Sequence, residues 1–348
     1  MKKYRLAIIG LGRMGSTIDE EVVDYPAIIR PYSIAAAARA IPRLELVAGC
    51  DIVATKNEAF REKWGVKSLY TDYRKMIEAE KPDMVAVCTP GVFHAEMAIA
   101  AAEAGTPMIF CEKAIACSMQ EADAVKKSVE ARHTLFNTGV LRRWDARYHH
   151  ARDLIQSGKV GRVQAVVHYG IANLLHSHIH SVDTVMFLIG DSRARSVWGE
   201  LRPRSLQFQN NRLNQDPLAV FQIEFENGVQ ASTVAAGNWD FEIIGTEGAI
   251  RGMNNGIDWS LRTKRPLGDR HYTLAAADFP LGPEPRSATV ACLEDLIDSL
   301  EQHGQTLGNV VVTHHATEIL FAAAECHRQN GRRQSLPIEN RELYVNHR

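Results

Sequence analysis

Residues 5–15 read RLAIIGLGRMG, a short apolar run followed by glycines in the spacing Gly-x-Gly-x-x-Gly. Gly10 permits a tight turn, Gly12 lets the backbone approach a pyrophosphate, and Gly15 allows a helix to pack closely on a strand. The first N–H groups of that helix then face the anion. The stretch therefore predicts a strand, a dinucleotide-binding loop and a helix, on condition that an acidic residue ends the next strand.

Asp51 is that acidic residue, because it directly follows the apolar run Leu44–Cys50. A carboxylate at this point accepts hydrogen bonds from the ribose hydroxyls and repels a 2′-phosphate, which favours NAD over NADP. Arg13 and Lys56 are cations of the same region that can still neutralise a phosphate. The predicted cofactor residues here are Gly10, Leu11, Gly12, Arg13, Met14, Gly15, Asp51 and Ile52.

The spacing between these two motifs is unusual. From Gly10 to Asp51 is 41 positions, against about 20 in the usual fingerprint. The surplus lies in residues 16–43, where Ala35–Ala40 is predicted as the end of a helix and Tyr25–Tyr32, with two prolines, as a loop. A lid over the cofactor, an interface and neutral padding are equal alternatives for it. If it is a lid, deleting the loop should damage substrate handling more than folding.

Apolar strand patterns alternate with helical patterns over the first 140 residues, which predicts a parallel, doubly wound sheet. The predicted strands are Arg5–Ile9, Leu44–Cys50, Met84–Cys88, Met108–Cys111 and Thr134–Thr138. The predicted helices are Lys56–Trp64, Tyr73–Glu80, His94–Ala104 and Met119–Ala131.

After about residue 140 strands follow strands, separated by turns such as ENG and TEG, which predicts an open, mostly antiparallel sheet. The predicted strands are Val163–Tyr169, Ser196–Gly199, Ala219–Glu226, Gln230–Ala235 and Asp240–Ile244. The predicted helices are Arg147–Ser157, Ser181–Ile189, Ala288–Gln302 and Asn309–Gln329. Residues 262–278 have the least structured pattern.

The fold class is therefore α/β plus α+β. Residues 1–140 are predicted to form a Rossmann-type dinucleotide-binding domain. Residues 141–348 are predicted to form a substrate-binding and oligomerisation domain with closing C-terminal helices. Two domains also suit a chain of 348 residues, which is long for one core.

Composition excludes several other classes. The net charge is −1, with 45% hydrophobic and 23% charged residues, so no global attraction to nucleic acid or to a membrane surface is expected. No apolar run approaches the length of a membrane span. The six cysteines contain no Cys-x-x-Cys pair, which indicates buried thiols in a reducing compartment, and the cytoplasm is the expected location.

Ligands of doubly wound sheets bind beyond the carboxyl ends of the strands. Those ends add Thr89, Pro90, His94, Glu112 and Lys113 to the predicted cofactor site. A lysine at this edge can polarise a carbonyl or stabilise an alkoxide.

A second constellation lies in HSHIHSVDTVMFLIG. His176, His180 and Asp183 share one face opposite an apolar stripe if the helix extends back to His176. A histidine there can take a hydroxyl proton while hydride leaves the same carbon. The same spacing is geometrically possible for zinc.

Arg143 and Trp144 lie where the chain enters the second domain. An arginine can bind an acidic group and a tryptophan can stack on a sugar, but a role at the domain interface is equally compatible with the sequence. Asn173, His176 and Asp183 complete the predicted substrate contacts.

Seven segments in order resemble the Gfo/Idh/MocA family of NAD(P)-dependent sugar and cyclitol oxidoreductases. They are IIGLGRMG, GCD, AVCTPGVFHAEMAIAAAEAG, CEKAIA, LRRWDARYHHARDLIQSGKVGRV, HIHSVDTVMFLIG and EIIGTEGAIR. The resemblance implies NAD(P) in the first domain and a sugar-like substrate on the second. It also implies that Glu112-Lys113 matches the family's Glu-Lys motif and that His180 matches its catalytic histidine, which explains His180 without a metal.

The chain departs from the family pattern at two positions. His176 stands where an aspartate is common, and Ala114 stands where the family has proline. A cis peptide after Lys113 is then less expected, because a non-proline cis bond costs about 2.5–4 kcal/mol.

Three functions are compatible with these residues. The first is an NAD-dependent dehydrogenase acting on a secondary carbinol of a sugar, glycoside or cyclitol, with His180 as acid and base, His176 nearby, and Lys113 stabilising the alkoxide. The second uses tightly bound NAD for transient oxidation and elimination of a glycosidic group. The third is a non-enzymatic sugar- or NAD-sensing protein. The resemblance also implies a homodimer or homotetramer.

Overall fold

The structure is a computed structural model that describes residues 2–347, which divide into two compact units. Unit 1 contains the chain up to Trp144, Arg286–Thr317 and the C-terminal residues from Asn346. Unit 2 contains Asp145–Pro285 and Glu318–Val345. The chain therefore enters unit 1 again at Arg286 and unit 2 again at Glu318. Neither unit is one consecutive stretch, unlike the division at residue 140 that the sequence suggested.

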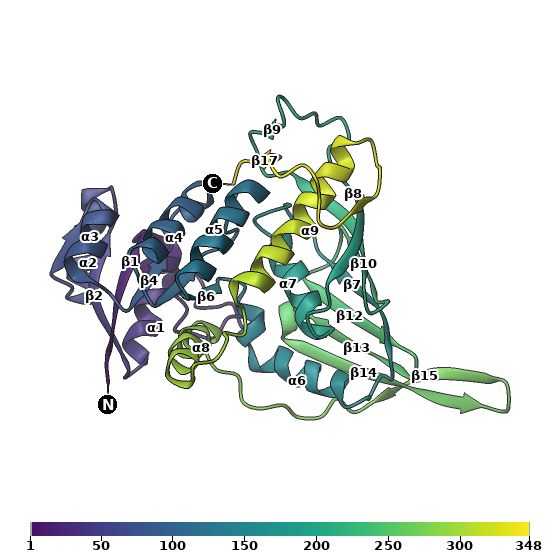
Figure 1. Cartoon of the computed structure of the whole chain (residues 1–348). Coiled ribbons are helices and arrows are strands. Elements are labelled where there is room, and N and C mark those ends of the chain that lie inside the picture. Colours follow the sequence, from purple (N-terminus) through teal and green to yellow (C-terminus); the bar gives the residue numbers. More distant parts are fainter. Residues whose placement is uncertain (1, 348) are drawn as a thin grey trace. The chain divides into compact units, whose positions relative to one another are not determined.

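Unit 1 is built on a six-stranded parallel sheet in the order β3-β2-β1-β4-β5-β6 (Figure 1). Helices α3, α4 and α5 pack in a row, and α1 packs against α8. The strands are β1 (Tyr4–Ile9), β2 (Leu44–Cys50), β3 (Ser68–Tyr70), β4 (Met84–Val87), β5 (Met108–Cys111) and β6 (Leu135–Thr138). The helices are α1 (Ile34–Ala40), α2 (Ala54–Trp64), α3 (Tyr73–Glu80), α4 (His94–Glu103), α5 (Met119–Ala131) and α8 (Ala288–Gln302).

The predicted doubly wound sheet is confirmed, and its central strands form the core. Every residue of β4 and β5 is fully buried, as expected for parallel strands covered on both faces. Ile9 pairs with Cys50 and Val87 pairs with Cys111, so the strands end at one edge of the sheet. The additional strand β3 has no clear sequence signal, because it has only three residues and none is fully buried.

The glycine loop does not open the regular helix that the sequence predicts. Arg13–Thr17 forms one π-helical turn (η1) and Ile18–Glu20 one 3₁₀ turn (η2), and α1 follows only at Ile34. The main-chain N–H groups of Ser16 and Thr17 both donate to the Gly12 carbonyl oxygen, at 2.8 and 3.4 Å. A regular α-helix therefore does not begin directly after the glycine loop.

The two carboxylate oxygens of Asp19 anchor the surplus segment, residues 16–43, at Tyr32 and Ser33. The N–H groups of Tyr32 and Ser33 donate to Asp19 at 2.7 and 2.8 Å, and the Ser33 hydroxyl then accepts from Ala36 N–H as the N-cap of α1. Burial alone would raise the pKa of Asp19. The hydrogen bonds from Tyr32 and Ser33 lower it by more, so the pKa of this carboxyl lies below its usual value. The predicted loop and helix end are thus parts of a tethered structure.

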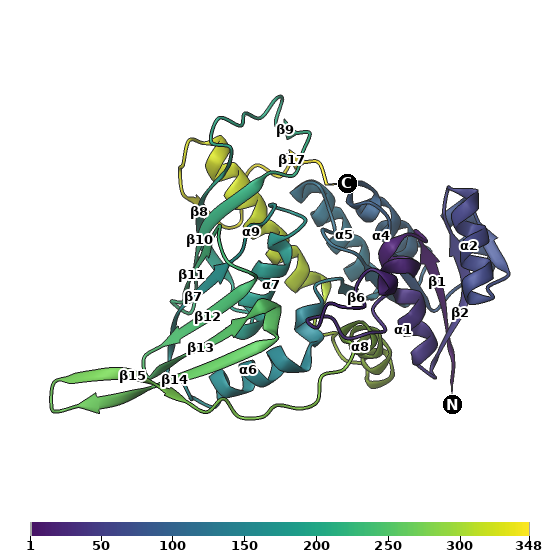
Figure 2. The ribbon, with the colours of Figure 1, turned by 180° about the vertical axis from the view of Figure 1, so that it is seen from behind.

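Unit 2 is built on a nine-stranded, mostly antiparallel sheet in the order β15-β14-β13-β12-β7-β11-β10-β8-β16 (Figure 2). Only β7 and β11 pair in parallel within it. The strands are β7 (Val163–Tyr169), β8 (Ala194–Arg202), β10 (Leu218–Phe225), β11 (Gln230–Val234), β12 (Asp240–Gly245), β13 (Gly248–Met253), β14 (Asp258–Leu267), β15 (His271–Ala277) and β16 (Gln334–Ser335), and a separate pair is formed by β9 (Arg212–Leu213) and β17 (Tyr344–Val345). The helices are α6 (Ala146–Gln156), α7 (His178–Leu188) and α9 (Val310–Arg328), of which α9 belongs to unit 2 from Glu318 onward.

The stretch 262–278, which has the least structured pattern in the sequence, forms most of the β14–β15 hairpin. Figure 2 shows this hairpin extending past β13. Its tip is exposed and rich in cations, so it lacks the apolar alternation that reveals a half-buried strand. No helix among residues 2–347 is both long and apolar enough to cross a membrane.

The Asp19 tether is testable by stability. Asp19→Asn keeps the shape of the side chain but presents an amide N–H₂ to one main-chain donor, so the free energy of unfolding should fall by about 1–3 kcal/mol. Asp24→Asn, in the same segment at an exposed position, is the matched control and should leave it unchanged. Urea unfolding of both variants measures the difference, and equal stabilities would show that the tether does not contribute.

Candidate active site

Asp51 joins the end of β2 to the glycine loop. Its Oδ2 accepts the N–H of Leu11 at 3.0 Å, and its Oδ1 accepts the N–H of Val53 at 3.0 Å. Lys56 Nζ lies 3.6 Å from Oδ2. The carboxylate is 8% exposed and each oxygen retains a lone pair, so it can accept further hydrogen bonds from a diol.

The three glycines of the loop have different steric roles. Gly10 has φ +91°, and a Cβ there would lie 2.7 Å from the Cys88 carbonyl carbon. A Cβ on Gly15 would lie 2.0 Å from the Gly10 oxygen. A Cβ on Gly12 would meet nothing closer than Lys56 Nζ at 3.9 Å. Gly10 and Gly15 are therefore required by the fold, whereas Gly12 faces open space next to a cation, which fits a pyrophosphate.

His94 is placed differently from its prediction as a cofactor contact. It is 1% exposed, its Nδ1 lies 2.8 Å from the Ala114 oxygen, and its Nε2 lies 2.6 Å from the Thr89 oxygen. Burial lowers the pKa of the imidazole, although the two carbonyl contacts oppose this. His94 thus ties the end of β4 to the segment after β5. Thr89 and Pro90 remain at the carboxyl edge, half-buried and exposed respectively.

Glu112 and Lys113 follow β5 at the same edge. Glu112 is 7% exposed, and burial raises its pKa, with the charge of Lys113 as the largest opposing effect. Its Oε1 has no hydrogen-bond partner among the described residues, and its Oε2 accepts the Lys113 N–H at 3.2 Å. Lys113 is half-buried. The Lys113–Ala114 peptide is cis even though alanine replaces proline, which corrects the sequence-based expectation.

Trp144 belongs to a buried polar network in unit 1. Its indole N–H donates to Asp295 Oδ2 at 3.1 Å, which also accepts from Asn137 Nδ2 at 2.9 Å. Trp144 is 5% exposed and Arg143 is completely buried. These positions favour a structural role for both residues over the predicted stacking on, or ion pairing with, a substrate.

The helix α7 begins at His178, so it does not extend back to His176 as the shared-face prediction required. The reason is Asp216, whose two oxygens accept the N–H groups of Leu175 and His176 at 2.8 and 2.7 Å. Asn173 Nδ2 donates to the Asp216 main-chain oxygen at 2.7 Å, so its amide holds the same loop. Sequence reasoning missed Asp216, and its only signal was the turn-forming Asp-Pro pair.

His180 lies in the first turn of α7, half-buried, with its ring perpendicular to Trp239 at a centroid distance of 6.5 Å. Asp183, one turn later, is 2% exposed. His176 is exposed outside the helix. His180 and Asp183 therefore keep the helical spacing expected of a base and its neighbouring carboxylate.

His178 has a structural role. Its Nδ1 lies 2.9 Å from the Ser181 hydroxyl and its Nε2 lies 2.9 Å from the Ala219 oxygen. Burial lowers its pKa to about 4, although the Ala219 contact opposes this. The neutral ring joins the start of α7 to β10 and thereby fixes the turn that carries His180.

A family model described as an oxidoreductase family with an NAD-binding Rossmann fold matches residues 4–140. The match spans all six strands of the parallel sheet. Residues 4–140 belong to the Gfo/Idh/MocA oxidoreductase family.

Individual relatives extend the similarity beyond residues 4–140. It is 27% identical to an NAD⁺-dependent scyllo-inositol 2-dehydrogenase of Bacillus subtilis over 71% of the chain and 73% of the relative. It is 26% identical to a D-glucoside 3-dehydrogenase of Escherichia coli over 68% of the chain and 67% of the relative. The crystal structure of an aldose-aldose oxidoreductase from Caulobacter crescentus has the same fold, with a TM-score of 0.77 and 19% identity over 96% of this chain and 100% of the other.

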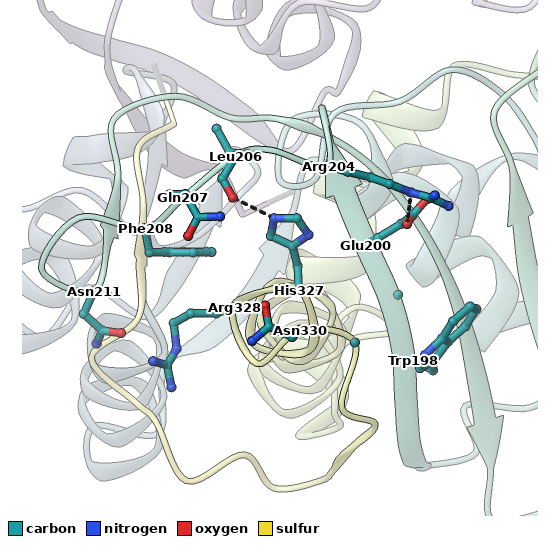
Figure 3. A pocket seen from close by; sticks show the side chains of 12 residues that line it. Trp198, Glu200, Arg204, Leu206, Gln207, Phe208, Asn211, His327, Arg328 and Asn330 are labelled. Carbon is teal, nitrogen blue, oxygen red and sulfur yellow. Dashed lines mark hydrogen bonds and ion pairs between the residues drawn. The ribbon is translucent and has the colours of Figure 1, made fainter.

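A separate cavity of about 510 Å³ lies in unit 2 beside β8 and the end of α9 (Figure 3). His327 connects two segments next to this cavity. The His327 Nε2 lies 2.9 Å from the Leu206 oxygen, and the His327 Nδ1 accepts the Leu201 N–H at 3.2 Å. None of the residues predicted for this oxidoreductase site lines the cavity. Within residues 2–347, no three His, Cys, Asp or Glu side chains are grouped to hold a metal ion.

The glycine loop gives a paired prediction. Gly15→Ala should destabilise the protein by several kcal/mol, because its Cβ overlaps the main chain at Gly10. Gly12→Ala should fold normally and bind NAD at least tenfold more weakly. Thermal unfolding and NAD titration of the two variants separate these effects, and normal NAD binding by Gly12→Ala would contradict a pyrophosphate at this position.

His178 predicts a pH dependence of stability. Its folded pKa of about 4 lies below the ordinary value of 6.5, so protons bind preferentially to the unfolded chain between these values. The neutral ring makes its full contribution to the free energy of unfolding above pH 6.5, and this contribution falls by about 3 kcal/mol as the pH approaches 4. The variant His178→Gln should unfold with a weaker pH dependence in urea titrations from pH 7 to 4.5, and an unchanged dependence would contradict this role.

Proposed function

We propose that unit 1 binds NAD with its pyrophosphate over Gly12 and its adenosine ribose at Asp51. The open space at Gly12 supports the first contact, and the unused lone pairs of a buried carboxylate at the end of β2 support the second. Ile52 is 84% exposed beside Asp51, which provides an apolar surface for the adenine.

NAD is preferred over NADP in this proposal. The Asp51 carboxylate repels a 2′-phosphate, whereas Lys56 Nζ, 3.6 Å from Oδ2, opposes that repulsion only from an exposed position. Arg13 does not add a free cation, because its guanidinium pairs with Glu21 at 2.8 Å. The balance of charge near the ribose is therefore unfavourable for a phosphate.

The proposed reaction is oxidation of a secondary carbinol of a sugar, glycoside or cyclitol. When bound, the nicotinamide would accept hydride from the carbinol carbon. His180 takes the hydroxyl proton, because a neutral imidazole nitrogen accepts a hydrogen bond and can act as a general base. Lys113, at the carboxyl edge of β5, places its ammonium charge against the developing alkoxide.

The substrate class rests on the relatives. One acts on scyllo-inositol and another on D-glucosides, so both act on a ring that carries several secondary hydroxyls. For this chain, the main support for the proposal is the half-buried His180 beside Trp239. An aromatic ring next to a base can pack against the apolar face of a sugar-like ring.

The decisive assay follows NADH absorbance with a panel of inositols, glucosides and free aldoses. At least one of them should be oxidised, and His180→Ala should lower kcat by at least a hundredfold while NAD still binds. His327→Ala, in the separate cavity, is the matched histidine control. Near-normal turnover by His180→Ala would remove it from the mechanism, and glycoside cleavage without net NADH would support transient oxidation instead.

A further inference from the structure

The segment 89–91, which follows β4, packs directly against the glycine loop. Main-chain pairing continues past the strand, because the Cys88 N–H donates to the Ile9 oxygen at 2.7 Å. One residue later, a Cβ on Gly10 would lie only 2.8 Å from the Thr89 nitrogen. A shift of Thr89 therefore changes the packing of the glycine loop.

The same segment is also linked to the residue that follows Lys113. His94 makes the link, because its Nε2 lies 2.6 Å from the Thr89 oxygen and its Nδ1 lies 2.8 Å from the Ala114 oxygen. Segment 89–91 thus joins the two parts of the carboxyl edge to which the proposed function assigns cofactor binding and stabilisation of the alkoxide.

His347, which lies outside the residues 4–140 of the family match, packs on the last residue of this segment. The three heavy atoms nearest to a Cβ built on Gly91 all belong to the His347 ring, with Nδ1 overlapping the Cβ and Cγ and Cε1 at 2.9 Å. His347 is 4% exposed, and the chain enters unit 1 again at Asn346, so this contact lies within unit 1. Position 91 therefore accepts only glycine while the ring stays in place.

We propose that His347 is a positioning residue for the nicotinamide half of NAD. The strand order places β1 between β2 and β4, and a dinucleotide crosses a doubly wound sheet at such a point. With the adenosine ribose at the end of β2, the nicotinamide half extends over the end of β4, where segment 89–91 lies. His347 acts through Gly91, because its ring fixes the main chain directly after the exposed Pro90. The inference rests on the proposed function, which brings NAD to this edge of the sheet.

The first measurement compares His347→Ala with the wild type by titration of NAD and of ADP, which carries only the adenosine half and two phosphates. Removal of the ring frees the main chain at Gly91, so NAD should bind about fivefold to tenfold more weakly, while the affinity for ADP stays within about twofold. His314→Ala is the matched control, because His314 Nε2 lies 2.7 Å from Asp123 Oδ1 in the same unit. This control should change neither affinity. A merely structural role of His347 would weaken NAD and ADP alike, or neither, and both results overturn the proposal.

The second measurement is a double-mutant cycle between Gly91→Ala and His347→Ala. In the presence of the ring the added methyl group overlaps it, so Gly91→Ala alone should weaken NAD at least about tenfold. In the His347→Ala background the same methyl group has room and should have no further effect on NAD affinity. Gly304→Ala is the matched control, because a Cβ there meets no heavy atom within 4 Å, and it should bind NAD as the wild type does.

Equal weakening of NAD by Gly91→Ala in the two backgrounds overturns the proposal. If His347→Ala does not fold, His347→Gln replaces it in both measurements with the same expectations, because a flexible side chain can move away from Gly91. Absence of NAD binding by the wild type is a failure of the proposed function, and the inference fails with it. Wild-type binding of NAD that the His347 variant fully retains is a failure of this inference alone.

Discussion

The hydrogen bond from Leu11 N–H to Asp51 is the contact on which the cofactor edge depends. It joins the turn after β1 to the end of β2, across 40 positions of sequence. The parallel register brings Ile9 and Cys50 side by side, so the two strand ends lie next to each other. Asn57 adds a second layer, because its amide donates to the Asp51 carbonyl oxygen at 2.8 Å and accepts the Asp51 N–H at 3.2 Å. The position of the carboxylate is therefore determined before any ligand arrives.

The long surplus segment is compatible with this edge because its ends are held. Lengthening a loop adds little to the entropic cost of closing it, and Asp19 together with the start of α8 restrains Tyr32 and Ser33. A lid that opens freely would lack these contacts. The segment is anchored to unit 1 at Tyr32 and Ser33.

Much of the fold was predictable because burial leaves a pattern in the sequence. β2, β5, β7, α3, α5 and α8 have the predicted bounds. Three of the failures share a physical cause, because each depends on a partner distant in sequence. Asp216 accepts the N–H of His176 and keeps this residue outside α7. Asp295 accepts the indole N–H of Trp144, and pairing with β13 orders the charged strand β14. The roles of Lys113, His180 and Asp51 in the reaction remain predictions.

The central claim is that the glycine loop and Asp51 form a site for NAD in preference to NADP. Isothermal titration of the wild-type protein with each dinucleotide tests it most directly. The account predicts one NAD bound per chain, with an affinity at least tenfold higher than that for NADP. Tighter binding of NADP, or no binding of NAD, would contradict it.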